Sequence, residues 1–149
     1  MALLDELKAH GMCLCKTEGD SMQPMLTEGK STVIIKTPTF PLKKYDIPVY
    51  RREDRWVMHR IVHVTKKGGY IICGDNRAHL ERDITEKDIV GVLAGYYEGD
   101  TFVDVYTDKA YLAYAKRVCR TYPIRFCTHA FKKMCQLFRR KNKKKNSKT

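Results

Sequence analysis

Three short segments of the chain contain residues that could perform nucleophilic or acid–base chemistry. The first is Gly-Asp-Ser-Met-Gln-Pro-Met-Leu (19–26), in which a glycine stands two residues before Ser21 and a proline three residues after it. A turn of this kind exposes the serine oxygen and leaves nearby backbone N–H groups able to face an oxyanion, as a nucleophile requires. Gly-Asp-Ser is also common in ordinary turns, so this segment alone makes Ser21 only a candidate nucleophile.

His59 is the candidate general base. It lies in the Val- and Ile-rich stretch Trp56–Val64, where the alternative is a histidine packed in the core. His63 follows four residues later, but on a strand the two histidines would lie about 13 Å apart, too far for both to bind one ion through Zn–N bonds of about 2 Å. The six cysteines include no C-x-x-C pair, which favours reduced thiols. We therefore expect no metal site and no cofactor.

A carboxylate that follows the serine and the histidine could complete a triad. Asp75 lies in Gly-Asp-Asn-Arg (74–77), directly after an apolar strand, and Glu81 lies six residues further on. Catalytic triads occur with their three residues in several sequence orders, so an acid that follows both the serine and the histidine is compatible with a triad. Gly-Asp-Asn is equally typical of a turn, and the residues alone also allow Asp75 a structural role in capping that turn.

Taken together, the ordered segments resemble the signal peptidase I and LexA-type serine peptidases. The matching segments are 19–26, Lys-Tyr-Asp-Ile-Pro-Val-Tyr (44–50), His-Arg-Ile-Val (59–62) and Gly-Asp-Asn-Arg (74–77). The resemblance covers about residues 12–106. It implies that Ser21 is the nucleophile and that His59 is the base.

The resemblance also implies which branch of the superfamily applies. Bacterial signal peptidases and LexA carry a lysine at the position of His59, whereas the endoplasmic-reticulum type carries a histidine. In that branch the triad acid lies six residues beyond the Asp of Gly-Asp-Asn, which implies Glu81 as the acid and a structural role for Asp75. Asp75 as the orienting acid is the alternative. Gly19 stands where many bacterial members have a serine that helps to bind the oxyanion, so backbone N–H groups are the expected donors here.

The elements that would position these residues follow from the spacing of apolar residues. Residues 2–10 have the spacing of a short helix that ends at Gly11, and from Cys13 to Thr107 the apolar residues alternate with period two. The predicted strands are Thr32–Lys36, Ile47–Arg51, Trp56–Val64, Tyr70–Cys73, Ile89–Ala94 and Thr101–Tyr106. Gly68-Gly69 predicts a hairpin turn, and Pro38 and Pro41 predict a loop. The pattern predicts a mainly β, compact antiparallel domain, and the resemblance makes it a coiled β domain of the LexA and signal peptidase type.

From Lys109 the spacing of apolar residues becomes helical. Pro123 is expected to divide this stretch into two helices, and the lysine-rich end is expected to be disordered. The predicted organisation is an N-terminal helix (1–11), a peptidase domain (12–108), a basic amphipathic helical extension (109–140) and a disordered basic tail (141–149).

The charge of the chain is concentrated at one end. Residues 1–108 carry 15 basic and 17 acidic side chains, whereas residues 109–149 carry 14 basic and none acidic. A basic segment of this kind attracts phosphates, so an anionic membrane surface is an expected partner of residues 109–149. The N-terminus carries Asp5 and Glu6 close to its leucines and lacks the basic region of an export signal, and no apolar run could span a bilayer. We expect a cytoplasmic protein, or one peripheral to the inner face of the membrane.

The sequence therefore predicts a serine endopeptidase that cleaves a protein or precursor-peptide substrate. The catalytic residues would be Ser21, His59 and Glu81, with Asp75 close by. Two alternatives belong to other classes: a binding module on a peptidase fold with an inactive site, and a nucleic-acid or membrane-binding protein driven by the basic tail. Specific nucleic-acid binding is not expected, because the body is net negative and has no basic, aromatic strand face.

Overall fold

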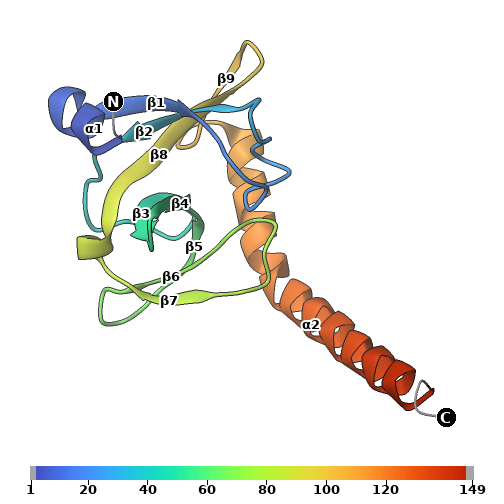
Figure 1. Cartoon of the computed structure of the whole chain (residues 1–149). Coiled ribbons are helices and arrows are strands. Elements are labelled where there is room, and N and C mark those ends of the chain that lie inside the picture. Colours follow the sequence, from blue (N-terminus) through green and yellow to red (C-terminus); the bar gives the residue numbers. More distant parts are fainter. Residues whose placement is uncertain (1–2, 147–149) are drawn as a thin grey trace.

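The computed structural model describes the backbone of residues 3–146 and the side chains of residues 3–127. Its strands form two antiparallel sheets, and the C-terminal helix extends away from them (Figure 1). The helices are α1 (Leu3–His10), the 3-10 helix η1 (Glu86–Asp88) and α2 (Lys109–Asn146). The strands are β1 (Met12–Lys16), β2 (Thr32–Lys36), β3 (Pro48–Arg52), β4 (Arg55–Met58), β5 (Arg60–Val64), β6 (Tyr70–Cys73), β7 (Glu81–Ile84), β8 (Ile89–Glu98) and β9 (Thr101–Asp104). The mainly β, antiparallel class predicted from the sequence is confirmed.

The larger sheet is organised around β8. Its strand order is β1-β2-β8-β3-β4, and β9 also pairs with β8. The sequence predicted that β8 ends at Ala94, but the strand continues to Glu98. The strand continues through Gly95, where the ring of Phe102 on β9 fills the space that a side chain would occupy. A Cβ on Gly95 would lie only 2.6 Å from Cε2 of Phe102.

The predicted strand Trp56–Val64 is two strands that belong to different sheets. β4 pairs with β3 and β5 pairs with β6, and His59 is the residue between them. The single-strand prediction was wrong because Val and Ile are enriched in both halves, whereas the change of pairing partner depends on tertiary contacts. His59 therefore lies where the chain passes from one sheet to the other.

The smaller sheet has the order β5-β6-β7. The hairpin turn predicted at Gly68-Gly69 is confirmed: it joins β5 to β6, with Gly68 at a φ of 82° and the N–H of Thr65 donating to the carbonyl of Gly69. The third strand, β7, was not predicted, because its sequence Glu-Arg-Asp-Ile lacks an apolar pattern. It pairs with β6 in the register Ile72 with Glu81, which brings Glu81 to this sheet.

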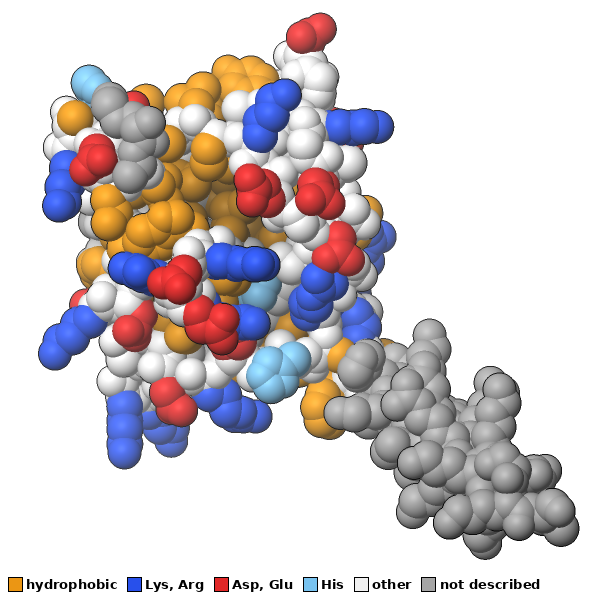
Figure 2. Space-filling view, viewed as in Figure 1, with side chains coloured by type: hydrophobic (Ala, Val, Ile, Leu, Met, Phe, Trp, Pro, Cys, Tyr) orange, Lys and Arg blue, Asp and Glu red, His pale blue; other side chains and the backbone are white. Residues whose placement is uncertain are grey.

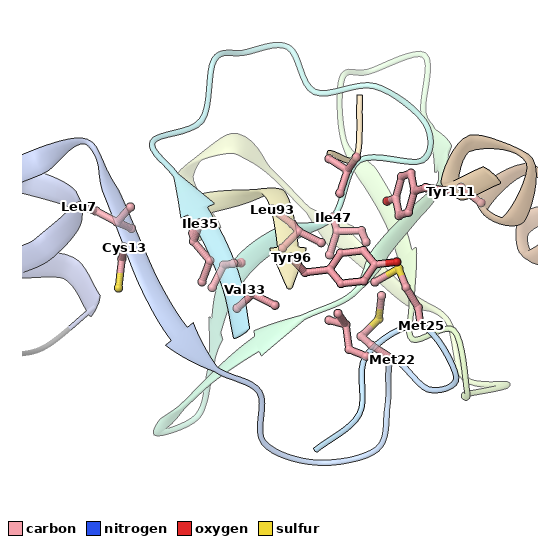
Figure 3. Packing of buried hydrophobic residues seen from close by; sticks show 14 residues of the cluster. Leu7, Cys13, Met22, Met25, Val33, Ile35, Ile47, Leu93, Tyr96 and Tyr111 are labelled. Atoms are coloured by element: carbon pink, nitrogen blue, oxygen red, sulfur yellow. The ribbon is translucent and has the colours of Figure 1, made fainter. Parts of the chain in front are cut away.

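The buried apolar residues form two clusters. The first lies between α1, the larger sheet and the start of α2 (Figure 3). It includes two methionines, Met22 and Met25, that come from the loop between β1 and β2 and contact the cluster beside Tyr96 and Ile47. The second cluster, which includes Tyr50, Ile61 and Ile72, joins the two sheets.

Helix α2 is continuous through Pro123, so the predicted division into two helices was wrong. Pro123 removes the N–H that would donate to the carbonyl of Cys119, and two side chains donate to other carbonyls of the same turn. The Thr121 hydroxyl donates to Arg117 O and Val118 O, and the Arg125 guanidinium also donates to Val118 O. The backbone is helical as far as Asn146, and residues 147–149 lie outside the described part, so the disordered tail (141–149) stays a prediction. Among the described residues, no helix is both long and apolar enough to cross a membrane.

Candidate active site

His59 and Glu81 form a hydrogen-bonded pair at the junction of the two sheets. Nδ1 of His59 lies 2.7 Å from Oε1 of Glu81, although the two residues are 22 positions apart in the chain. Both side chains are largely buried, at 8% and 13% exposure. An ionised carboxylate only accepts hydrogen bonds, so Nδ1 carries the proton and donates it. The opposite nitrogen, Nε2, is then the one with a free lone pair.

Tyr50 and Arg52 of β3 complete the surroundings of Glu81. The Tyr50 hydroxyl lies 3.1 Å from Nδ1 of His59, and the Arg52 guanidinium lies 3.5 Å from Oε2 of Glu81. Burial of the carboxyl would by itself raise its pKa, but the hydrogen bonds from His59 and Tyr50, together with the charge of Arg52, outweigh burial and lower the pKa of Glu81 to about 2. Glu81 is therefore ionised at neutral pH.

Ser21 lies in the loop between β1 and β2, and this loop is held from both sides. On one side Met22 and Met25 are buried in the first apolar cluster. On the other side the N–H of Asn76 donates to the carbonyl oxygen of Ser21, at 2.8 Å. A Cβ on Gly74 would lie 2.7 Å from that same carbonyl oxygen, so the close approach requires glycine at position 74.

Gly74 also brings the serine loop next to His59. A Cβ on Gly74 would lie 3.1 Å from Cδ2 of His59, the ring carbon adjacent to Nε2, as well as close to the Ser21 carbonyl. Within the described residues, however, Ser21 Oγ and His59 Nε2 do not form a hydrogen bond. The backbone N–H groups of Ser21 and Met22 likewise find no acceptor in the described part of the chain. The serine, the imidazole edge and two N–H donors without an acceptor therefore lie in one small region.

Within the described residues Asp75 forms no hydrogen bond with His59, and it pairs with Arg60. Nε and Nη2 of Arg60 donate to the two carboxylate oxygens of Asp75, at 2.8 and 2.7 Å, and both side chains are fully buried. Arg60 also donates to the carbonyl of Tyr45 and to the hydroxyl of Tyr111. Burial opposes the charge on Arg60, but the pair with Asp75 raises its pKa above the usual value. Asp75 is thus a partner of a structural cation rather than of the imidazole.

Helix α2 supports the turn that carries Asp75. The Tyr114 hydroxyl donates to Oδ2 of Asp75 at 3.1 Å, and the Tyr122 hydroxyl donates to the carbonyl of Ala78 at 2.7 Å. The Arg125 guanidinium donates to the backbone carbonyl of Asp75. Because the same turn contacts Ser21 through Asn76, the first half of α2 is part of the structure that positions the serine loop.

Cys73 is the other nucleophilic side chain close to this region. Its thiol is buried and donates to the carbonyls of Gly74 and Arg77. Burial raises the pKa of Cys73 to about 12, so at neutral pH it is a protonated thiol and a poor nucleophile. His63, the second histidine of the segment, is exposed on β5. Among the described residues, no group of three or more His, Cys, Asp and Glu side chains could hold a metal ion.

Sequence reasoning did not assign a role to Tyr50 or to Arg60. Both lie inside segments that were recognised, 44–50 and 59–62, but neither residue type signals catalysis by itself. For Arg60 a signal was available: an arginine directly after a candidate base, in a segment otherwise apolar, must be paired if it is buried. No comparable signal exists for Tyr50, because tyrosine is common in strands.

No protein-family model matches this chain, and a comparison with characterised proteins finds no significant match.

Proposed function

We propose that this protein is a serine endopeptidase with Ser21 as the nucleophile, His59 as the general base and Glu81 as the acid that orients the base. One observation carries the proposal: the imidazole of His59 has the Glu81 carboxylate on its Nδ1 side and the Ser21 loop near its Nε2 edge. The chain therefore has a serine, a base and an orienting acid in the mutual order that triad chemistry needs.

In the proposed mechanism, Nε2 of His59 takes the proton of Ser21 Oγ as that oxygen attacks the carbonyl carbon of the scissile peptide. The imidazolium that forms is stabilised by the ionised Glu81, whose low pKa keeps it negatively charged. The imidazolium then donates its proton to the leaving amine, and a water molecule hydrolyses the acyl-serine by the same steps. The Ser21–His59 hydrogen bond would form when a substrate excludes water, as is common for catalytic contacts that are open in a free enzyme.

The oxyanion of the tetrahedral intermediate would be bound by backbone donors. The N–H groups of Ser21 and Met22 are the candidates, because both lack an acceptor within the described residues and both belong to the loop that carries the nucleophile. The buried side chain of Met22 fixes the orientation of this part of the loop. A rigid donor is worth more to the reaction than a mobile one, since it needs no reorganisation in the transition state.

An extended peptide is the substrate class that the surroundings of the site favour. β1 is an edge strand of the larger sheet and leads directly into the Ser21 loop, so a peptide could add to it as a further strand. Met12 and Leu14 of β1 are exposed apolar side chains, and apolar side chains also gather on the face of the body drawn in Figure 2. We extend the proposal to the fold: the ordered segments 19–26, 44–50, 59–62 and 74–77 support a coiled β domain of the signal peptidase and LexA type.

The test is labelling with a fluorophosphonate probe, which reacts only with an activated serine. The wild-type protein should be labelled at Ser21, as located by mass spectrometry, and Ser21→Ala and His59→Ala should not be labelled. Two matched controls should keep the label. Ser31→Ala changes a serine that is buried and accepts the N–H of Thr27, and His63→Ala changes the exposed histidine.

A second measurement identifies substrates. Peptides that are present in cells with the wild-type protein and absent with Ser21→Ala would be cleavage products. If the folded wild-type protein takes no label and produces no Ser21-dependent peptides, the peptidase proposal is wrong. The inactive binding module would then be the better interpretation, and salt-dependent binding of RNA would favour the nucleic-acid alternative instead.

A further inference from the structure

Helix α2 has two halves that differ in their relation to the body. In the first half, three apolar residues are buried against the body: Tyr111, Ala115 and Tyr122. In the second half the helix extends beyond both sheets (Figure 1). The change comes at Ile124 and Phe126, which are 65% and 54% exposed. The body therefore does not cover the apolar side chains with which the projecting half begins.

The sequence of the projecting half continues this apolar pattern. Ile124, Cys127, Phe131, Met134 and Phe138 recur at intervals of three and four, which is the spacing of one side of a helix. The basic residues fall between them, and residues 128–149 contain nine basic residues and no acidic one. We call residues 124–146 the basic arm.

We propose that the basic arm docks on an anionic lipid surface, with its apolar residues at the boundary of the headgroups and its lysines and arginines among the lipid phosphates. A helix that combines an apolar side with Lys and Arg, and that has no acidic residue to oppose them, fits such a surface by both shape and charge. The body is a poor competitor for this contact, because residues 1–108 have two more acidic than basic side chains. On the face of the body shown in Figure 2, acidic and basic side chains are interspersed.

A second copy of the chain is a weaker occupant of the same helix. Two basic arms side by side would bring the positive charges of both chains together with no negative charge to pair them, and like charges oppose association. RNA would satisfy the charges but would leave the apolar residues without a role. Lipid accounts for both features.

Contacts between α2 and the body give the arm a fixed starting direction. Tyr114 and Tyr122 of the first half, and Arg125 at the start of the arm, attach the helix to the turn that carries Asp75. The arm is therefore anchored to the body where it begins, and less conformational freedom is lost on docking than for a flexible tail. This inference does not depend on the chemistry of Ser21.

The experiment is co-sedimentation of the full-length protein with vesicles at low salt. Neutral phosphatidylcholine vesicles are compared with vesicles that also contain phosphatidylglycerol. We expect binding to the anionic vesicles only, and loss of binding at high salt, because salt screens the attraction. Absence of binding to anionic vesicles at low salt would overturn the proposal.

Two pairs of variants assign the contact to the arm. The basic variant replaces Lys132, Lys133, Arg139 and Arg140 with Gln, and its control makes the same change at the exposed Lys8, Lys36, Lys66 and Lys67. Each near-surface charge is worth about a fivefold change in binding, so the arm variant should bind on the order of several hundred-fold more weakly. Equal losses in the arm variant and in its control would overturn the assignment.

A second pair of variants, which changes exposed apolar residues, distinguishes lipid binding from RNA binding. Ile124→Ser with Phe126→Ser should weaken vesicle binding, whereas Phe40→Ser with Tyr106→Ser, which changes exposed residues of the body, should not. Binding to a single-stranded RNA is measured with the same proteins. If RNA binds more tightly than anionic vesicles, and the Ile124 and Phe126 changes affect neither, the arm is a nucleic-acid element and the lipid proposal is wrong.

Discussion

The two carboxylates of the site region, Glu81 and Asp75, lie six residues apart in the chain but have opposite surroundings. Glu81 accepts from the imidazole of His59 and keeps 13% exposure, with Arg52 at its outer oxygen. Asp75 binds a permanently charged guanidinium through both oxygens and is fully buried. A carboxylate that accepts from an imidazole can orient that ring and stabilise the imidazolium, whereas a carboxylate bound through both oxygens to a buried arginine is committed to that ion pair.

The difference explains how one turn can serve both stability and the candidate site. The Arg60–Asp75 pair joins β5, the turn 74–78 and α2 through shared hydrogen bonds. That pair fixes the turn, and the turn holds the carbonyl of Ser21 through Asn76. We therefore expect changes at Glu81 to affect turnover and changes at Asp75 to affect folding.

The largest effect is expected for Glu81→Gln. The amide keeps the shape of the side chain but removes the charge that orients His59 and stabilises the imidazolium. Loss of an orienting carboxylate costs up to about 10⁴-fold in kcat in a well-formed triad. The measurement is kcat on a Ser21-dependent peptide, with the melting temperature recorded in parallel. A variant that keeps most of its kcat would remove Glu81 from the triad.

Asp75→Asn should instead unfold the protein more easily. The substitution leaves the guanidinium of Arg60 buried without its counter-charge, and breaking a buried pair in this way costs about 3–5 kcal/mol of unfolding free energy. Chemical denaturation of the wild type and the variant measures this loss. The reverse pattern, a stable Asp75→Asn variant with strongly reduced kcat, would give the orienting role to Asp75.

Acid should weaken the fold partly through Glu81. Its pKa is lowered from 4.5 to about 2 in the folded state, so the unfolded chain binds this proton first as the pH falls. The stability that Glu81 contributes is complete above about pH 5 and is lost as the pH falls towards 2. Melting temperature measured from pH 6 to pH 2 should therefore fall less steeply in Glu81→Gln than in the wild type. Parallel curves for the two proteins would contradict the lowered pKa.

A smaller, matched pair of effects is expected from two tyrosines. Tyr50→Phe removes the hydroxyl next to His59 and Glu81, and Tyr114→Phe removes the hydroxyl on Asp75. Each hydrogen bond to a charged group is worth about 1.5–3 kcal/mol. Both variants should lower the melting temperature by a few degrees, but Tyr50→Phe should also lower kcat about tenfold, whereas Tyr114→Phe should leave kcat nearly unchanged. Equal effects of the two on kcat would show that the regions are not functionally distinct.

Local periodicity was enough to predict several strands and the segments that carry the candidate chemistry. Thr32–Lys36 and Tyr70–Cys73 were predicted with the bounds that the structure has, since alternating β-branched residues leave few other ways to bury one face. Such periodicity could not predict β7, whose charged sequence becomes a strand only because β6 offers a free edge. It also could not predict that a helix passes through Pro123.

The choice of carboxylate that meets the histidine depended instead on tertiary contacts. Glu81 and Asp75 both follow His59 in the chain, and the resemblance alone favoured Glu81. The contact forms because the chain changes sheets at His59 while β7 pairs with β6, which brings Nδ1 within 2.7 Å of Oε1. Arg60 points into the core from the next position and binds Asp75. Neighbouring residues of an extended chain face opposite sides, and which acid lies on each side depends on contacts distant in sequence.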